Sequence, residues 1–195
     1  MKILFATANP NKAFEIQKIV PKGFEILSLK DINFSDDIPE TSATIEGNAL
    51  QKTKFIVDKF KIDCFSDDTG LEIEALNGEP GVYSARYAGE ERDPEKNMDL
   101  VLEKMNNIEN RNARFKTVIA LYFEGHVHLF EGVVNGLIRK TKSGIDGFGY
   151  DPIFEPIGFG KTFAEMTIDE KNKISHRGRA FEKMVEFLKN ETCIR

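Results

Sequence analysis

The 195-residue sequence predicts an α/β fold built on a mixed sheet. Apolar strand patterns alternate with amphipathic helix patterns through residues 1–61, a hairpin pattern follows at residues 114–134, and helix patterns close the chain. Alternating strands and helices favour parallel strand pairing, whereas a hairpin is antiparallel. We therefore expect a mixed sheet that is flanked by helices.

The N-terminal segment predicts two strands, two helices and a loop. Apolar residues recur at helical spacing in two stretches, and short apolar runs without that spacing fit strands. A polar stretch that contains Pro39 fits a loop. The predicted elements are a strand at residues 2–7, a helix at 12–20, a strand at 24–29, a loop at 30–42 and a helix at 44–61.

An acidic segment follows between two predicted strands, at residues 62–66 and 71–75. The four residues between them, Asp67, Asp68, Thr69 and Gly70, suit a turn. Adjacent acids at the end of a strand can also hold a divalent metal ion and activate a water molecule. On these residues alone, the turn and the metal site are equally good interpretations.

A helix and a hairpin are predicted next. Asp93 followed by Pro94 is a good helix start, and the helix should run to about residue 105. Residues 114–123 alternate between apolar and polar, and Glu124-Gly125 can turn them into a second strand at 126–134. This pattern predicts a hairpin with one buried face.

The last third of the chain predicts two further helices. Asn135-Gly136 fits either another tight turn or a bulge in one longer strand. Residues 167–170 match a capping box for a short helix, and Ser175 can cap a final helix.

Composition narrows the class of protein. The net charge of −5 would repel nucleic acid, and no apolar stretch approaches the length of a membrane span. The apolar run at residues 3–6 is too short for the core of a signal peptide. Two cysteines, Cys64 in a predicted strand and Cys193 in a predicted tail, make neither a disulfide framework nor a zinc site. We expect a soluble cytoplasmic protein with one domain at residues 1–195, no nucleic-acid partner and no membrane partner.

Two polar groups precede the acids. Residues 7–12, Thr-Ala-Asn-Pro-Asn-Lys, join a strand to a helix, where N–H groups and the helix dipole can bind a phosphate. The segment is not a Walker loop, and an ordinary turn with an asparagine cap fits as well. Asn48 and Lys52 lie one turn apart on a predicted helix, so both could address one ligand.

Two more polar groups follow the hairpin. Residues 147–152, Gly-Phe-Gly-Tyr-Asp-Pro, leave a ring between two glycines, so a base could stack on Phe148 while Asp151 reaches its edge. The alternative is a glycine loop whose Phe148 fills the core. His176 and Arg177 start a helix, where the dipole disfavours cations unless an anionic group lies opposite.

Six short motifs follow one another along the chain. They are Thr7-x-Asn9-x-x-Lys12, Asn48-Ala49-x-x-Lys52, Ser66-Asp67-Asp68-Thr69-Gly70-Leu71, Pro80-Gly81-Val82-Tyr83-Ser84-Ala85-Arg86, Gly147-Phe148-Gly149-Tyr150-Asp151-Pro152 and Ile174-Ser175-His176-Arg177. In this order and spacing they resemble the inosine/xanthosine triphosphate pyrophosphatase family. Each motif alone is weak, but together they span nearly the whole chain and are highly specific.

The resemblance implies an enzyme of the nucleotide pool. Members depend on magnesium and cleave deaminated purine nucleoside triphosphates (ITP, dITP and XTP) between the α and β phosphates, which releases the monophosphate and pyrophosphate. It also implies an elongated, twisted mixed sheet flanked by helices, two lobes with an active-site cleft between them, and a homodimer.

The resemblance further implies a role for each motif residue. The triphosphate would be held by Thr7, Ala8, Asn9, Pro10, Asn11, Lys12, Lys52 and Lys171, and Asn48 would be a further substrate-binding residue. Glu40 and Asp68 would hold Mg²⁺, and Asp68 would also be the catalytic base with support from Asp67. Phe148 would stack on the purine, and Gly149, Tyr150, Asp151, His176 and Arg177 would line the base pocket with Thr69 and Arg86 nearby.

Base selectivity has a simple physical hypothesis. Asp151 facing purine N1 and Arg177 facing O6 suit hypoxanthine and xanthine, whereas adenine presents the reverse pattern at both positions. Each buried mismatch costs about 1 to 3 kcal/mol. Two rival functions are a phosphohydrolase that releases the γ phosphate and a nucleotide sensor without catalysis. The presence of both Asp67 and Asp68, with lysines at the phosphate positions, argues against the sensor.

Overall fold

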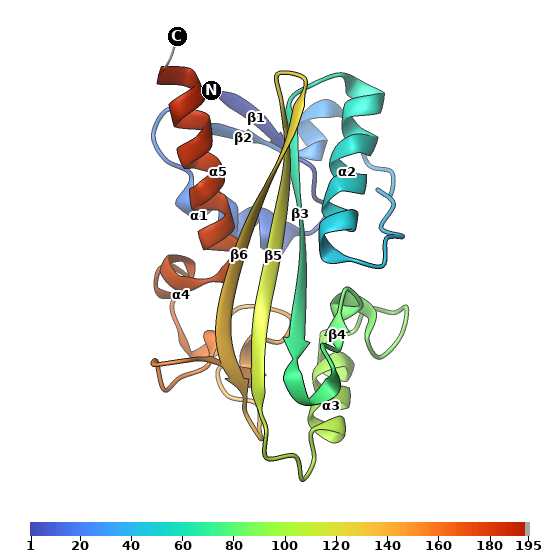
Figure 1. The fold of residues 1–195 in the computed structure, drawn as a ribbon, viewed down its shortest axis with the longest axis vertical. Coiled ribbons are helices and arrows are strands. Elements are labelled where there is room, and N and C mark those ends of the chain that lie inside the picture. Colours follow the sequence, from blue (N-terminus) through green and yellow to red (C-terminus); the bar gives the residue numbers. More distant parts are fainter. Residues whose placement is uncertain (194–195) are drawn as a thin grey trace. The chain divides into compact units, whose positions relative to one another are not determined.

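The predicted α/β class is confirmed in a computed structural model, which describes residues 1–193 (Figure 1). The strands are β1 (Lys2–Phe5), β2 (Glu25–Leu27), β3 (Cys64–Ile73), β4 (Pro80–Gly81), β5 (Asn112–Phe123), β6 (His126–Ile138) and β7 (Phe154–Pro156). The α-helices are α1 (Pro10–Ile19), α2 (Ile45–Phe60), α3 (Pro94–Lys104), α4 (Ile168–Ile174) and α5 (His176–Cys193). Short 3₁₀ helices are η1 (Leu29–Ile32), η2 (Glu74–Leu76), η3 (Ser84–Arg86), η4 (Asp151–Ile153) and η5 (Phe163–Glu165).

The sheet is mixed, as predicted. Its strand order is β2-β1-β3-β5-β6-β7, and β4 pairs with β3 off this path. β1 is parallel to both β2 and β3, whereas β3 with β4 and β6 with β7 are antiparallel. The β5–β6 hairpin turns at Glu124 and Gly125, whose φ values of 50° and 87° fit the predicted tight turn.

Side-chain caps fix the helix starts. Asn9 caps α1, Thr44 caps α2, Asp93 caps α3, and Thr167 forms a capping box with Glu170 at α4. The predicted starts of α2, α3 and α4 are confirmed. α1 begins two residues before its predicted start because Pro10 takes the first helical position. α5 includes Cys193, which was predicted to lie in a tail.

The chain forms two compact units. Unit 1 consists of Met1–Asp68, Thr117–Gly132 and the chain from His176 onward. Unit 2 consists of Thr69–Lys116 and Val133–Ser175. The chain therefore passes from unit 1 to unit 2 directly after Asp68.

In unit 1, the sheet is buried on both faces. Ile3 and Phe5 of β1 share a core cluster with α1 and α5, whereas Leu4 and Ala6 share another with α2. Side chains alternate between the faces of a strand, so α1 and α5 cover one face and α2 covers the other (Figure 1).

In unit 2, one face of the sheet is buried. Leu71 and Ile73 of β3 pack with Met98 and Val101 of α3 in a third cluster. The predicted one-faced pattern of the hairpin is correct in this unit, where Arg114 of β5 is exposed. It is wrong for the part of β5 in unit 1, because Val118 and Ala120 are also buried.

The structure decides two other predictions about the strands. The predicted turn at residues 67–70 is wrong, because β3 is one continuous strand through both acids and Gly70. Of the two alternatives at Asn135-Gly136, the longer strand is correct, because β6 continues to Ile138. None of the helices that the structure describes has the length and apolar character needed to cross a membrane.

Candidate active site

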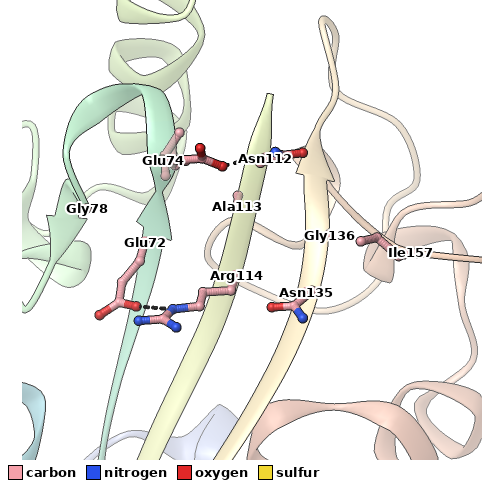
Figure 2. A pocket seen from close by; sticks show the side chains of 10 residues that line it. Glu72, Glu74, Gly78, Asn112, Ala113, Arg114, Asn135, Gly136 and Ile157 are labelled. Carbon is pink, nitrogen blue, oxygen red and sulfur yellow. Dashed lines mark hydrogen bonds and ion pairs between the residues drawn. The ribbon is translucent and has the colours of Figure 1, made fainter. Parts of the chain in front are cut away.

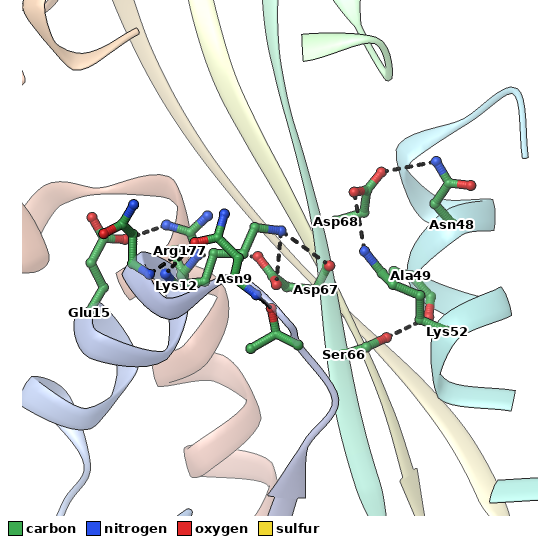
Figure 3. Close-up of polar contacts among 12 residues, drawn as sticks. Asn9, Lys12, Glu15, Asn48, Ala49, Lys52, Ser66, Asp67, Asp68 and Arg177 are labelled. Carbon is green, nitrogen blue, oxygen red and sulfur yellow. Dashed lines mark hydrogen bonds and ion pairs between the residues drawn. The ribbon is translucent and has the colours of Figure 1, made fainter. Parts of the chain in front are cut away.

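Strand β3 of unit 1 places two neighbouring acids on opposite faces of the sheet. Asp67 lies on the face of Phe65, which packs with α1 and α5, whereas Asp68 lies on the face of Cys64, which packs with α2. The adjacent carboxylates therefore do not converge on one metal ion, which corrects the simplest form of the metal-site prediction. Instead, Asp67 meets polar side chains from α1 and α5, whereas Asp68 meets polar side chains from α2 (Figure 3).

Asp67 is held by two cations. Lys12 Nζ of α1 lies 3.1 Å from Asp67 Oδ1, and Arg177 Nε of α5 lies 3.1 Å from Oδ2 (Figure 3). Arg177 Nη1 also donates to Glu15 Oε2 of α1. Asp67, Glu15 and Arg177 are each at most 3% exposed. A cation at a helix start was expected to need an anionic group opposite it. Arg177 has two, the carboxylates of Asp67 and Glu15.

These charges keep Asp67 ionised. Burial by itself would raise the pKa of Asp67, but the positive charges of Lys12, Arg177 and Lys52 outweigh it and hold the pKa below its ordinary value. For Lys12, burial lowers the pKa, helped by the charges of Lys52 and Arg177 and opposed by Asp67. A negatively charged ligand beside Lys12 would oppose the burial and the repulsion by Lys52 and Arg177, both of which lower the pKa of Lys12.

Asp68 has a different set of partners, on α2. Asn48 Nδ2 lies 3.3 Å from Asp68 Oδ2, and Lys52 Nζ lies 3.4 Å from Oδ1 (Figure 3). The Ser42 backbone N–H donates to Asn48 Oδ1 at 2.8 Å, which turns the amide N–H₂ toward Asp68. The predicted placement of Asn48 and Lys52 one helical turn apart on one face is confirmed, and in the structure both side chains meet Asp68.

The surroundings push the pKa of Asp68 upward. Burial is the largest cause, and the negative charges of Glu40 and Asp67 add to it, while Lys52 and Lys12 oppose it. Lys52 stays protonated, because Asp68 and Glu40 outweigh the burial that would lower its pKa. Asp68 is therefore a buried carboxylate with a raised proton affinity, as a general base requires.

The carboxylates of Glu40 and Asp68 both pair with the ammonium group of Lys52. Lys52 Nζ donates to Glu40 Oε1 and lies 3.4 Å from Asp68 Oδ1. Within the described residues, no group of three or more His, Cys, Asp or Glu side chains could hold a metal ion. Mg²⁺ is commonly bound by one or two carboxylates together with substrate phosphates and water, so this pair fits magnesium in the presence of a polyphosphate.

The strand-to-helix segment at residues 7–12 is a capped turn. Thr7 Oγ1 accepts from the Asn9 N–H, and Asn9 Oδ1 accepts from the N–H groups of Asn11 and Lys12. The asparagine cap that was one of the two interpretations is present, so these three N–H groups already have side-chain acceptors. Ala8, Pro10 and Asn11 are exposed, and the positive charge of the segment comes from Lys12.

Unit 2 contains a second group of predicted site residues. Asp151 Oδ2 accepts from Lys171 Nζ at 2.5 Å and from the Phe148 N–H at 2.8 Å. Lys171 Nζ also lies 5.0 Å from the centre of the Phe148 ring. The Asp151 and Lys171 side chains are buried, whereas Phe148 is half-buried. The structure thus brings Lys171 to predicted base-binding residues within unit 2.

The remaining predicted residues are distributed over both units. In unit 2, Tyr150 is buried and donates to the Ser84 carbonyl at 2.8 Å, Gly149 has a φ of 63°, and Thr69 and Arg86 are half-buried. The Arg86 guanidinium lies 5.4 Å from the centre of the exposed Tyr83 ring. In unit 1, His176 is buried at the start of α5.

Unit 2 also contains a cavity of about 560 Å³ (Figure 2). Among its lining residues, Glu72 pairs with Arg114, and Asn112 Nδ2 donates to Glu74 at 3.0 Å. It is lined by Glu72, Ile73, Glu74, Gly78, Asn112, Ala113, Arg114, Asn135, Gly136 and Ile157. None of the predicted site residues lines it.

Comparison with known proteins decides the family. Residues 3–187 match the family model described as the Ham1 family. The chain belongs to the Ham1 family. This membership confirms the resemblance that the six motifs indicated.

Relatives of this Ham1 chain match it over almost its full length. A dITP/XTP pyrophosphatase from Flavobacterium johnsoniae is 53% identical and covers 96% of this chain and 98% of its own. A protein of the same name from Christiangramia forsetii is 54% identical, with 96% and 99% covered. The solved Ham1 protein of Staphylococcus aureus is 37% identical, with a TM-score of 0.88 and 98% and 100% covered.

The sequence reasoning did not identify Glu15, a buried member of the polar network around Arg177. Glu15 is three residues after Lys12 on α1 and is buried beside Ile16, on the side of this amphipathic helix that packs on the core. A carboxylate at a core-facing position of an amphipathic helix was the available signal, because such a group needs a cationic partner. That partner is Arg177, 162 residues away in sequence.

Proposed function

We propose that this Ham1 protein hydrolyses deaminated purine nucleoside triphosphates (ITP, dITP and XTP) to the nucleoside monophosphate and pyrophosphate. The observation that carries the proposal is the identity of more than half of the residues, over nearly full length, with proteins named dITP/XTP pyrophosphatase. The buried acids and cations of unit 1 supply a chemical basis for it.

The proposal includes magnesium as the cofactor. In unit 1, the carboxylates of Glu15, Glu40, Asp67 and Asp68 lie among the cationic groups of Lys12, Lys52 and Arg177. The carboxylates would repel a triphosphate, and a divalent cation between them and the phosphates would offset that repulsion. Glu40 and Asp68 would hold Mg²⁺, which would offset the charge that develops on the pyrophosphate leaving group.

The two acids would divide the chemistry. Asp68, whose pKa is raised by burial, would accept the proton of the water that attacks the α phosphate. Asp67 would stay ionised and hold Lys12 in place for the phosphates, since Lys12 Nζ is bonded to both its carboxylate and its backbone carbonyl. Asn48 would hold Asp68 in position through its amide.

The proposal for the base rests on unit 2. Phe148 would stack on the purine, with Asp151 at the base edge. The Phe148 N–H and Lys171 both bond to Asp151 Oδ2, so the carboxylate stays charged and fixed beside the ring. Lys171 would reach the phosphates, and Arg177 would reach purine O6. In the structure Lys171 meets Asp151, and Arg177 meets Asp67 and Glu15.

A homodimer and a cytoplasmic location complete the proposal. The homodimer rests on the family resemblance, and the location rests on the composition. Light scattering coupled to size-exclusion chromatography would measure the mass in solution, for which one chain contributes 22.1 kDa.

Product analysis tests the function. The full chain would be incubated with ITP, dITP, XTP, GTP or ATP, with and without Mg²⁺, and pyrophosphate would be resolved from orthophosphate. We expect monophosphate and pyrophosphate from the deaminated nucleotides, only with Mg²⁺, while ATP is spared. Orthophosphate as the product would establish γ cleavage instead, and binding without turnover would establish a sensor. Asp68→Asn serves as the control for a contaminating activity.

A further inference from the structure

Gly132 of β6 is buried against the first turn of α5, within unit 1. A Cβ atom at this position would lie 2.0 Å from the carbonyl oxygen of His176 and 2.6 Å from the backbone nitrogen of Ala180. An α-helix joins residues at this spacing, i and i+4, through a backbone hydrogen bond. Any side chain on Gly132 would therefore collide with the first turn of the helix itself.

The colliding atoms belong to backbone, so rotation of a flexible side chain cannot relieve the contact. Carbon atoms in good contact lie about 3.5 to 4.0 Å apart, so the helix start would have to move by about 1 Å or more. The interior around this turn is closely packed, since His176, Arg177 and Ala180 are each at most 3% exposed.

The same turn carries Arg177. Its guanidinium is held at two points, by Asp67 Oδ2 at 3.1 Å from Nε and by Glu15 through Nη1. Those partners come from β3 and α1, whereas the backbone that carries Arg177 rests on β6 at Gly132. The distance between α5 and β6 therefore sets how far the guanidinium reaches.

We propose that Gly132 is a positioning residue of the active site: without a side chain, it lets the first turn of α5 lie on β6 where Arg177 reaches Asp67 and Glu15 together. Only the measurement of ITP hydrolysis depends on the proposed function. Gly132 would act through the position of α5 and not by contact with the substrate.

Gly136, four residues along β6, provides a matched control. A Cβ atom there would lie 2.4 Å from Phe154 Cζ and 2.5 Å from the Glu155 carbonyl oxygen, so alanine is equally crowded. These neighbours belong to unit 2, whereas Arg177 belongs to unit 1. Both substitutions should lower stability, but only Gly132→Ala should disturb Arg177.

The first experiment reads the position of Arg177 without using activity. An arginine Nε–H in a buried ion pair exchanges slowly with water, and its ¹H–¹⁵N signal would be assigned by its loss in Arg177→Lys. We expect the exchange of this signal to become at least about tenfold faster in Gly132→Ala and to be unchanged in Gly136→Ala. Unchanged exchange in Gly132→Ala would overturn the proposal, even if the protein proved not to hydrolyse ITP.

The second experiment is a double-mutant cycle on ITP hydrolysis. A displacement of 1 Å in an active site can cost about 100-fold in rate, so we expect about that loss of kcat/KM for Gly132→Ala in the wild-type background. In the Arg177→Lys background, where the two-point contact is already absent, we expect a loss below about threefold. Gly136→Ala should have the same effect in both backgrounds. An equal loss for Gly132→Ala in both would mean that it acts through folding alone.

If Gly132→Ala does not fold, Ala180→Gly takes its place in both experiments. It loosens the same helical turn without adding bulk. Faster Nε–H exchange and non-additivity with Arg177→Lys would support the proposal, and the absence of both would refute it.

Discussion

Asp67 and Asp68 are consecutive residues of β3, yet they belong to separate polar networks on opposite faces of the sheet. Asp67 meets Lys12 and Arg177, whereas Asp68 meets Asn48 and Lys52. Their surroundings push the two pKa values apart: Asp67 below its ordinary value and Asp68 above it. Such a divergence is how one site obtains both a permanent charge and a proton acceptor.

Asp68→Asn tests the proton acceptor. The amide fills the same space but cannot take a proton, so we expect kcat for ITP to fall by about 10² to 10⁴-fold while ITP still binds. Initial rates and calorimetric titration with ITP would measure the two quantities. Asn48→Ala, which removes only the neighbour that orients Asp68, should lose less. Near-normal turnover in Asp68→Asn would remove Asp68 from the role of base.

Asp67→Asn tests the permanent charge through stability. The substitution removes the carboxylate that the half-buried Lys12 shares with the buried Arg177, so the free energy of unfolding at pH 7 should fall by about 3 to 5 kcal/mol. Urea unfolding would measure it. A depressed pKa in the folded state means that the carboxylate stabilises the fold fully above its ordinary pKa of 3.8. That stabilisation is lost as pH falls toward the lower, folded-state value.

The difference between the wild type and Asp67→Asn should therefore shrink between about pH 5 and about pH 3. Lys2, which pairs with Glu25 on the surface of the same unit, offers a control. Lys2→Ala should change stability by less than about 1 kcal/mol. If the difference in unfolding free energy between the wild type and Asp67→Asn stayed constant over this pH range, the pKa of Asp67 would not be lowered in the folded state.

Local signals predicted the helices better than the acidic strand. Asp93 and Thr167 were recognised as helix starts because a cap acts within three residues of itself, and the helix from Thr44 was recognised from the spacing of its apolar residues. The turn predicted at residues 67–70 failed for the opposite reason. Asp-Asp-Thr-Gly has turn chemistry in isolation, but Lys12 stabilises Asp67 inside a strand from 55 residues away.

In the candidate site, too, local signals predicted some features, and contacts between distant segments decided others. The motifs predicted which side chains form the site, and helical spacing predicted that Asn48 and Lys52 would share one face of α2. The structure adds that both side chains meet Asp68. It could not be deduced from spacing that Lys171 meets Asp151, because that pairing depends on how η4 and α4 pack within unit 2. A buried carboxylate such as Glu15 was detectable as an anomaly, but its partner was not.

Asp151→Asn tests base selectivity. A carboxylate beside the purine can only accept a hydrogen bond, as the N1–H of hypoxanthine requires, whereas an amide can also donate to N1 of adenine. We expect the ratio of kcat/KM for ITP over ATP to fall by about 10 to 100-fold.

Lys171→Met is the control for loss of the buried pair, because it removes the cation and keeps the carboxylate. It should destabilise the protein as well but should preserve the preference for ITP. If Asp151→Asn and Lys171→Met changed the ratio equally, the selectivity would come from the shape of the site rather than from the acceptor.

Gly147→Ala and Gly149→Ala separate two costs of replacing glycine beside Phe148. Both positions have left-handed φ values, 78° and 63°, so alanine is strained at each by about 1 to 2 kcal/mol. At Gly147 the added Cβ would also lie 2.1 Å from Asp151 Oδ2, whereas at Gly149 it would meet no atom within 4 Å. Gly147→Ala should therefore cost more unfolding free energy and also raise KM for ITP, because Asp151 must move away from the Phe148 N–H. Urea unfolding with steady-state kinetics would measure both, and equal losses in the two variants would show that Asp151 is not held against the glycine turn.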